Sequence, residues 1–238
     1  MRKKKEGTKR QPGRPKADGT DRRQMILDVA LSEFGTRGYE GASLARIAAG
    51  ADITKAALLH YFQSKEALFA ELLAIRDLEN QKNVLRFNDP DKMSLEYLRQ
   101  EGVTMEWLFD GDIWTYLDLV IQLAKNNEQN PSQVKLFITV SSHATNRSGT
   151  GYEWLYNHWK HSISAVADGF EKAKERGTVK PDLPSYRVAR TLVAIMDGIQ
   201  LQWAVALDRK TDEWMAKTLH EELADYVELL RARYEVTL

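Results

Sequence analysis

One stretch of the sequence, residues 43–68, combines residue types and spacings that indicate a defined chemistry. Ser43 and Thr54 each stand where they would cap a short helix, and the residues from Gly50 to Asp52 form a tight turn between them. Two short helices that flank one sharp turn are typical of a helix-turn-helix, whose second helix enters the major groove of DNA. The apolar members would pack inside this unit and leave the polar ones for DNA: Leu44, Ile47, Ala48, Ile53, Leu58 and Phe62.

The N-terminus is a second feature that suits nucleic acid. Residues 1–23 hold ten Lys and Arg against three Asp and Glu, whereas the whole chain holds 34 of each kind. This asymmetry predicts that one end of the chain faces a polyanion. Residues 1–19 have almost no apolar content, so we expect a disordered basic arm. Its Gly13-Arg14-Pro15 core is similar to an AT-hook, in which Arg14 would enter a narrow minor groove; the alternative is a solvated tail that binds phosphates without selectivity.

The composition bounds the class of protein. At 238 residues, of which 43% are hydrophobic, the chain is long enough for a small domain and a larger one, each with a packed core. The absence of cysteine excludes disulfides, thiol nucleophiles and thiolate zinc sites. No apolar stretch approaches the ~18 residues that span a bilayer, and no signal-peptide pattern follows the basic N-terminus. We therefore expect a cytoplasmic protein without a membrane anchor.

The apolar periodicity predicts helices throughout and requires no strand. A first helix starts at Thr20 or Asp21 and ends near Gly35 and Gly38, and a long helix capped by Ser64 follows the helix-turn-helix. Further helices are predicted at about 94–109, 112–126, 131–145, 150–177, 184–208 and 212–235. The predicted fold is all-α: a disordered arm (1–19), a helix-turn-helix DNA-binding domain (20–66) and a larger helical effector-binding and dimerisation domain (67–238).

Only one of these helices competes with a strand. Residues 137–140 have β propensity, but Asn130 as a cap with Pro131 at the first helical position favours a helix there.

From about Met25 to Leu73 the sequence resembles the TetR family of bacterial transcription regulators. The resemblance rests on the order and spacing of Phe34, Gly38, Tyr39, the pair Ile47-Ala48, the cap Thr54 and the block of residues 60–68. It implies that the base edges are faced by Lys55, Ala56, Ala57 and Leu59. It implies that the phosphates are held by Ser43, His60, Tyr61 and Lys65. A helix N-terminus favours anions, and Lys and Tyr donate hydrogen bonds to phosphate oxygens, which supports this division.

Within that set Lys55 is the strongest candidate base reader, because a lysine can donate to guanine O6 and N7. The chain departs from the family pattern at three positions: Asp52 and Ala56 stand where glycine is usual, and Leu59 replaces a frequent tyrosine. Asp tolerates a left-handed turn, so we expect the fold to persist. The missing aromatic ring at Leu59 removes one expected contact, which affects which operator sequence is bound and not whether DNA is bound.

The resemblance extends through residues 175–203 and implies a homodimer. The last two helices would form a four-helix bundle across a two-fold axis. Both carry apolar stripes, of which a part serves the core of each subunit: Val188, Leu192, Ile195 and Ile199, then Leu219, Leu223, Tyr226 and Leu230.

An aromatic-rich region precedes these helices, and there the resemblance implies a ligand pocket. Aromatic walls with a few polar groups suit a largely apolar or aromatic ligand, or a cation held by ring faces. Aromatic residues at helical spacing are also typical of ordinary core. The candidate lining residues are Trp107, Trp114, His143, Trp154, His158 and Trp159.

No catalytic or metal-binding constellation emerges from the sequence. His158 and His161 lie three residues apart with Glu153 nearby, but zinc sites need three or four supported ligands, so we expect no metal and no cofactor. The sequence lacks a Gly-rich phosphate loop and a recognisable Ser-His-Asp set, so we expect no enzyme. The hypothesis is a repressor that a small-molecule effector releases from a palindromic operator in double-stranded DNA; the alternatives are an architectural DNA-binding protein without an inducer and a helical enzyme or carrier.

Overall fold

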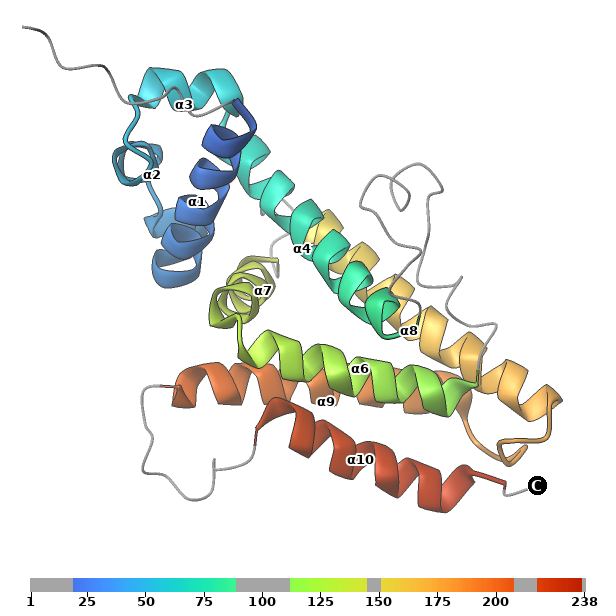
Figure 1. Ribbon diagram of the computed structural model, residues 1–238. Helices are drawn as coiled ribbons and strands as arrows, with labels where there is room; N and C mark the ends of the chain where they lie inside the picture. The colour runs from blue at the N-terminus through green and yellow to red at the C-terminus, as the bar shows by residue number, and fades with distance from the viewer. Residues whose placement is uncertain (1–18, 89–111, 145–150, 208–217, 237–238) are drawn as a thin grey trace, which may run out of the picture.

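Figure 1 shows the computed structural model, which describes residues 19–88, 112–144, 151–207 and 218–236. All regular elements in these ranges are helices, and one isolated bridge joins Val179 to Glu235. The all-α prediction is confirmed. In chain order the helices are α1 (Gly19–Gly41), α2 (Leu44–Gly50), α3 (Lys55–Tyr61), α4 (Lys65–Asn88), α6 (Ile113–Glu128), α7 (Pro131–His143), α8 (Tyr152–Glu175), α9 (Ser185–Ala206) and α10 (Leu219–Tyr234).

Several sequence predictions fall outside these ranges. They are the basic arm with Arg14, the helix at 94–109 with Trp107, and the start of the helix at 212–235. Where the structure does describe the chain, the predicted helices agree with it apart from their ends, which are the least certain part of any assignment. The β-prone run 137–140 is helical, with Pro131 in the first turn of α7.

Local backbone features shape the head, which we define as α1, α2 and α3. α1 is kinked at Gly38, whose φ of 71° lies in the left-handed region that glycine adopts without a Cβ penalty. α2 approaches α1 closely at Gly50, where an added Cβ would lie 2.7 Å from Cγ1 of Val29. The turn from α2 to α3 passes through Asp52 at a φ of 54°. The expectation that aspartate supports this turn is therefore confirmed.

A first hydrophobic core holds the head and continues beyond it. Phe34 is fully buried, with its ring centroid 5.8 Å from that of Tyr39 and 4.9 Å from that of Phe69. Leu136 and Phe137 of α7 belong to the same core. This core therefore crosses the predicted domain boundary between residues 66 and 67, which falls near the start of α4.

A second core lies among the helices at the base of the molecule in Figure 1, where α10 lies beside α6 and α9. Phe170 of α8 is fully buried there and meets the ring of Trp114 edge-on at 5.9 Å. Arg231 of α10 covers the other side of the Trp114 ring at 5.3 Å and donates a hydrogen bond to Asp118 at 2.9 Å. α10 is thus attached to α6 by apolar and polar contacts together.

Candidate functional site

The surface of α3 is the first candidate site. Thr54 caps this helix, since its hydroxyl oxygen accepts a hydrogen bond from the Ala57 N–H at 3.1 Å. Leu58 is fully buried and anchors α3 on the first core. Lys55 and Ala56 are exposed, so the first turn of α3 presents an amine and a methyl group to solvent. Ala57 and Leu59, also predicted to face bases, are half-buried.

The residues predicted to hold phosphates lie at helix ends around α3. Ser43 is the N-cap residue of α2 but makes no side-chain capping bond. His60 is exposed at the end of α3, and its ring meets that of the half-buried Tyr61 at 6.2 Å. Lys65 opens α4, and its Nζ lies 4.4 Å from the centroid of the Tyr39 ring. The Ser43 hydroxyl, the Tyr61 phenol and the Lys65 amine thus lie at helix ends near α3 in the chain.

Ion pairs fix the head helices relative to each other. Glu33 of α1 pairs with Arg46 of α2 at 2.5 Å and with Arg37 at 3.3 Å. Arg23 of α1 forms a bidentate pair with Glu71 of α4. These pairs join α1 to α2 and to α4, the helices that precede and follow α3 in the chain.

The second candidate site is a cavity of about 410 Å³ between α4, α6, α8 and α9. Its size falls in the range of about 300–1,000 Å³ that is usual for ligand pockets. Its walls come from both cores, with Phe137 from the first and Tyr116 and Leu192 from the second. The apolar walls include Val120, Leu123, Val166, Leu192, Val193 and Met196, and the polar ones include Arg76, Asp77, Asn80, Asn157, His158 and Asp197.

Arg76 is the most unusual residue of this cavity. It is only 5% exposed, and its guanidinium lies over the rings of Phe137 at 4.8 Å and Trp154 at 5.5 Å. Its nearest carboxylate oxygen is that of Asp77, 3.6 Å from Nη1, which is beyond hydrogen-bond distance. Nη1 is buried without a hydrogen-bond partner among the described residues. Burial lowers the pKa of Arg76, although an arginine remains charged in this setting.

Two carboxylates share the cavity with this arginine. Asp77 accepts a hydrogen bond from the indole N–H of Trp154 at 2.7 Å, which ties α4 to α8. Asp197 of α9 accepts one from the indole N–H of Trp159 at 2.8 Å. Burial raises the pKa of both carboxyl groups, that of Asp197 to about 6. The buried charges are therefore only partly compensated.

His158 contributes a neutral ring to the cavity. It stacks on Trp154 with ring centroids 5.1 Å apart and meets Phe137 edge-on at 5.6 Å. Burial first, and then the positive charge of Arg76, lower its pKa to about 3. Within the ranges that the structure describes, no three His, Asp or Glu side chains gather closely enough to hold a metal ion.

The six predicted ligand-binding residues have different surroundings. Trp154 and His158 line the cavity. Trp159 lies on the outer side of α8, in a groove with Tyr186, and reaches the cavity only through its bond to Asp197. Trp114 packs inside the second core. His143 ends α7, and Trp107 lies outside the described residues.

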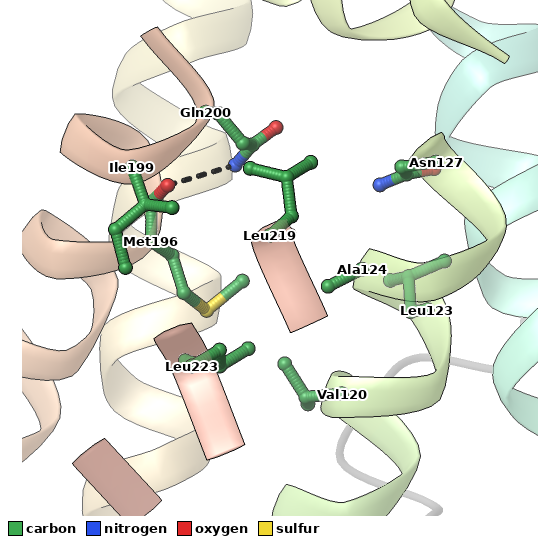
Figure 2. Close-up of a pocket in the computed structure, with 9 residues that line it drawn as sticks. All are labelled: Val120, Leu123, Ala124, Asn127, Met196, Ile199, Gln200, Leu219 and Leu223. Atoms are coloured by element: carbon green, nitrogen blue, oxygen red, sulfur yellow. Dashed lines mark hydrogen bonds between the residues drawn. The ribbon is translucent and has the colours of Figure 1, made fainter. Parts of the chain in front are cut away.

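A second, small pocket adjoins the cavity, and we call it the extension. Figure 2 shows this site of about 30 Å³ between α6, α9 and α10, with Ala124, Ile199 and Leu223 in its wall. It shares Val120, Leu123, Asn127, Met196 and Gln200 with the main cavity. The Gln200 side chain donates to the Met196 carbonyl oxygen at 3.3 Å, and its own Oε1 is buried without a hydrogen bond to any described residue.

The polar residues of the cavity were not identified from the sequence. Arg76, Asp77 and Asp197 lie on helices whose charged positions resemble ordinary solvent-facing ones. One signal was available: Asp197 stands within the apolar run of α9, where a charge interrupts the buried stripe.

The outer face of α8 and α9 carries exposed apolar side chains. Tyr156 and Trp159 of α8 and Tyr186, Leu201 and Val205 of α9 are exposed, Val205 at 70%. α10, by contrast, buries most of its apolar residues in the second core: Leu219, Leu223, Val227, Leu230 and Tyr234. Over the described ranges, no helix is long and apolar enough to cross a membrane.

Residues 26–72 match the family model described as "Bacterial regulatory proteins, tetR family". The chain is 28% identical to the A-factor receptor protein of Streptomyces griseus, over 75% of this chain and 53% of that protein. It is 41% identical to the regulator YdgC of Bacillus subtilis, over 24% of this chain and 30% of that protein. It is 23% identical to the regulator AcrR of Shigella flexneri, over 92% of both chains. The chain thus spans about half or less of the length of the first two relatives.

Solved structures have the same fold. SmeT, the repressor of the Stenotrophomonas maltophilia multidrug efflux pump SmeDEF, has a TM-score of 0.62 at 16% identity, over 90% of both chains. GusR of Salmonella enterica has a TM-score of 0.56 at 20% identity, over 90% of this chain and 100% of that one. The helix-turn-helix at residues 43–68 thus lies within a segment that matches the TetR family of bacterial regulatory proteins, and the chain as a whole shares the fold of these solved structures.

Proposed function

We propose that this protein is a homodimeric transcription repressor that binds an operator through α3 and is released from it by a small-molecule effector. The observation that carries the proposal is the capped and firmly seated α3, which exposes Lys55 in its first turn. A helix presented in this way fits the major groove, where an amine can donate to guanine O6 and N7.

Phosphate contacts would fix the register of α3 on the duplex. Tyr61 and Lys65 carry donors at the end of α3 and the start of α4, and Ser43 has a hydroxyl that no capping bond uses. Such contacts position a protein without reading the sequence. Arg14 in the N-terminal arm would add a minor-groove contact.

The second half of the proposal is the coupling between cavity and head. α4 carries Arg76 and Asp77 in the cavity and begins directly after α3. Phe137 lines the cavity and also belongs to the core that holds α1. An effector that fits the cavity better in one arrangement of these helices would shift the distance between the two heads of a dimer, and only through that difference in affinity.

The dimer interface that we propose lies on α8 and α9. The exposed apolar side chains on these helices form a face that a second copy could cover, since large exposed patches mark interaction sites. The sequence suggested the last two helices instead. α10 uses its apolar stripe within the subunit, so of these two helices we retain only α9.

The test is binding of the purified protein to DNA from beside its own coding region, measured across a salt series. Lys55→Ala should weaken binding to the specific site roughly 5- to 150-fold, and leave binding to random DNA nearly unchanged. Tyr61→Ala should weaken both, because it removes a phosphate contact. Lys172→Ala, an exposed lysine on α8, is the matched control and should change neither.

An architectural protein would give a different result. Its binding would depend strongly on salt but would not discriminate between sites, and Lys55→Ala would reduce it no more than Lys172→Ala does. That outcome would replace the repressor by the architectural function. Absence of DNA binding at low salt would reject both.

A further inference from the structure

We propose that the cavity accepts an uncharged amphiphile: a head with an acceptor oxygen, such as a carbonyl, bound by Arg76, and an apolar tail that extends between α6, α9 and α10. This inference rests on the proposed function, because it names the chemical class of the effector. It depends on three features of the cavity, which are its unpaired donor, its charges and its division into a polar and an apolar end.

The unpaired donor defines what the ligand must supply. The Arg76 guanidinium carries five N–H donors, and its buried Nη1 has no hydrogen-bond partner among the described residues, since the Asp77 oxygen is 3.6 Å away. A buried donor without an acceptor is unfavourable by roughly 1–3 kcal/mol. A ligand oxygen that accepts from Arg76 would remove this penalty.

The charges in the cavity argue against an ionic ligand. Asp77 and Asp197 already face the single positive charge of Arg76. A carboxylate ligand would add a third negative charge to a buried space, which is strongly unfavourable. A cationic ligand would lie beside Arg76, and the ring faces of Phe137 and Trp154 that would attract it are occupied by this guanidinium. The sequence-based alternative of a cation held by ring faces is therefore disfavoured, whereas a neutral oxygen is compatible with both charges.

The shape of the cavity accounts for the tail. Most of the polar side chains lie on α4 and α8 and most of the apolar ones on α6 and α9, although Asn127 of α6 and Asp197 and Gln200 of α9 also line the cavity. Beyond them lies the small apolar extension of Figure 2, lined by Ala124, Ile199 and Leu223. In Figure 2 the Gln200 oxygen points away from the Met196 carbonyl that its nitrogen bonds. The buried Gln200 oxygen thus lies where the main cavity meets the extension, so the tail would pass an acceptor there.

A series of probes with one tail and three heads tests the inference. Octanamide, octanoate and octylammonium are titrated into the full-length protein at pH 7 by calorimetry, and ligand-dependent thermal stabilisation provides a second readout. Octanamide should bind at least about tenfold more tightly than either ion, as expected for one charge-assisted hydrogen bond gained without an added buried charge. Tighter binding of octanoate or octylammonium, or no binding of octanamide, would overturn the inference.

Variants of the protein show separately where the head and the tail of the ligand bind. Arg76→Met should weaken octanamide binding by roughly tenfold or more, since it removes a hydrogen bond from a charged donor. Arg76→Lys, which keeps a charge and a donor, should lose less, and Arg187→Met, an exposed arginine of α9, should lose nothing. Ala124→Leu fills the extension and should weaken decanamide binding but not hexanamide binding. Equal octanamide affinity in Arg76→Met and Arg187→Met would show that the amide group of the ligand does not bind Arg76, which would contradict the proposal.

DNA binding of the same preparations separates this inference from the proposed function. If the wild-type protein binds its operator and octanamide does not bind, the inference fails and the function stands. If octanamide binds as expected but operator binding is absent, the function fails, and the cavity chemistry remains as described.

Discussion

The first core around Phe34, called here the head core, and the cavity between α4 and α9 are both built from large buried side chains. They differ in how much open volume and how much charge they enclose. The head core is closed: its aromatic rings contact each other, and its charged residues pair on the outside of the helices. The cavity keeps about 410 Å³ of open volume together with one arginine and two carboxylates. A closed core holds the DNA-contacting surface in one geometry, whereas an open and polar junction gives up stability in the absence of ligand and can regain it when one binds.

The position of the cavity adds to this difference. Because its walls belong to both cores, a ligand there would contact the support of the head and the helices that carry the proposed dimer face at the same time. Asp197 lines the cavity and also bonds Trp159 on the outer face of α8. Few residues therefore separate the ligand site from the proposed interface.

Matched truncations should give the largest contrast between the two regions. Leu68 is fully buried in the head core, and Leu192, equally buried, lines the cavity. Leu68→Ala should lower the free energy of unfolding by about 3–5 kcal/mol, because a new void forms among close-packed neighbours. Leu192→Ala should cost about 2 kcal/mol, since part of its surroundings is already open. Urea unfolding with equal m-values measures both, and equal losses would show that the cavity is closed in solution.

The next largest effect should be the pH dependence caused by Asp197. Its pKa is raised to about 6 in the folded protein, above the value of about 3.9 in an unfolded chain, so the folded state binds the proton first. Stability should therefore rise as pH falls from 7 to 5, relative to Asp197→Asn, by about 1.3 kcal/mol. Arg76, Lys160, His161 and Arg190 line the two pockets that Asp197 also lines, and they are unchanged in the variant.

The comparison with Asp197→Asn is needed because His158 acts in the opposite direction. Its lowered pKa of about 3 means that the unfolded state gains a proton first as pH falls below about 6.5, so this residue lowers the stability of the protein in acid. The difference between wild type and Asp197→Asn at each pH cancels this contribution. Parallel curves for the two proteins would show that Asp197 is not buried as described.

A smaller effect is expected at the cap of α3. Thr54→Ala removes the acceptor for the Ala57 N–H and should lower the free energy of unfolding by about 1 kcal/mol. It should also weaken operator binding, because the first turn that carries Lys55 would fray. Thr54→Ser keeps the oxygen and should behave like wild type, and Thr115→Ala, an exposed threonine in the first turn of α6, is the control. Unchanged operator binding in Thr54→Ala would show that the cap is not needed for DNA contact.

The two regions also differ in how far the sequence predicts them. The head follows from local signals: the Thr54 cap, the turn at Asp52 and the Ser64 cap each act within a few residues, and all three occur in the structure. The course of α7 followed in the same way from Asn130 and Pro131. Such features depend on backbone chemistry that adjacent residues decide.

The cavity depends on contacts between distant residues, which local patterns do not contain. Asp77 and Trp154 are 77 residues apart, and only the folded arrangement of the chain brings them together. Trp114 and Trp154 both stand in the first turn of a helix with a tyrosine two residues later, yet Arg231 covers the first and the cavity opens beside the second. Their side chains were therefore predictable as buried, but not as core or as cavity wall.

The smallest predicted effect concerns the turn that sets α2 against α3. Asp52 holds a φ of 54°, which an L-residue adopts at some energetic cost and glycine adopts freely. Asp52→Gly should raise the free energy of unfolding by up to about 1 kcal/mol, whereas Asp52→Val should lower it by at least as much. Asp52→Asn removes the charge but keeps the turn, so it isolates the electrostatic part. If the carboxylate repels DNA phosphates, Asp52→Asn and Asp52→Gly will tighten operator binding equally at low salt, although only Asp52→Gly is more stable. Tighter binding in Asp52→Gly alone would mean that strain in the turn, and not charge, limits how α3 meets the groove.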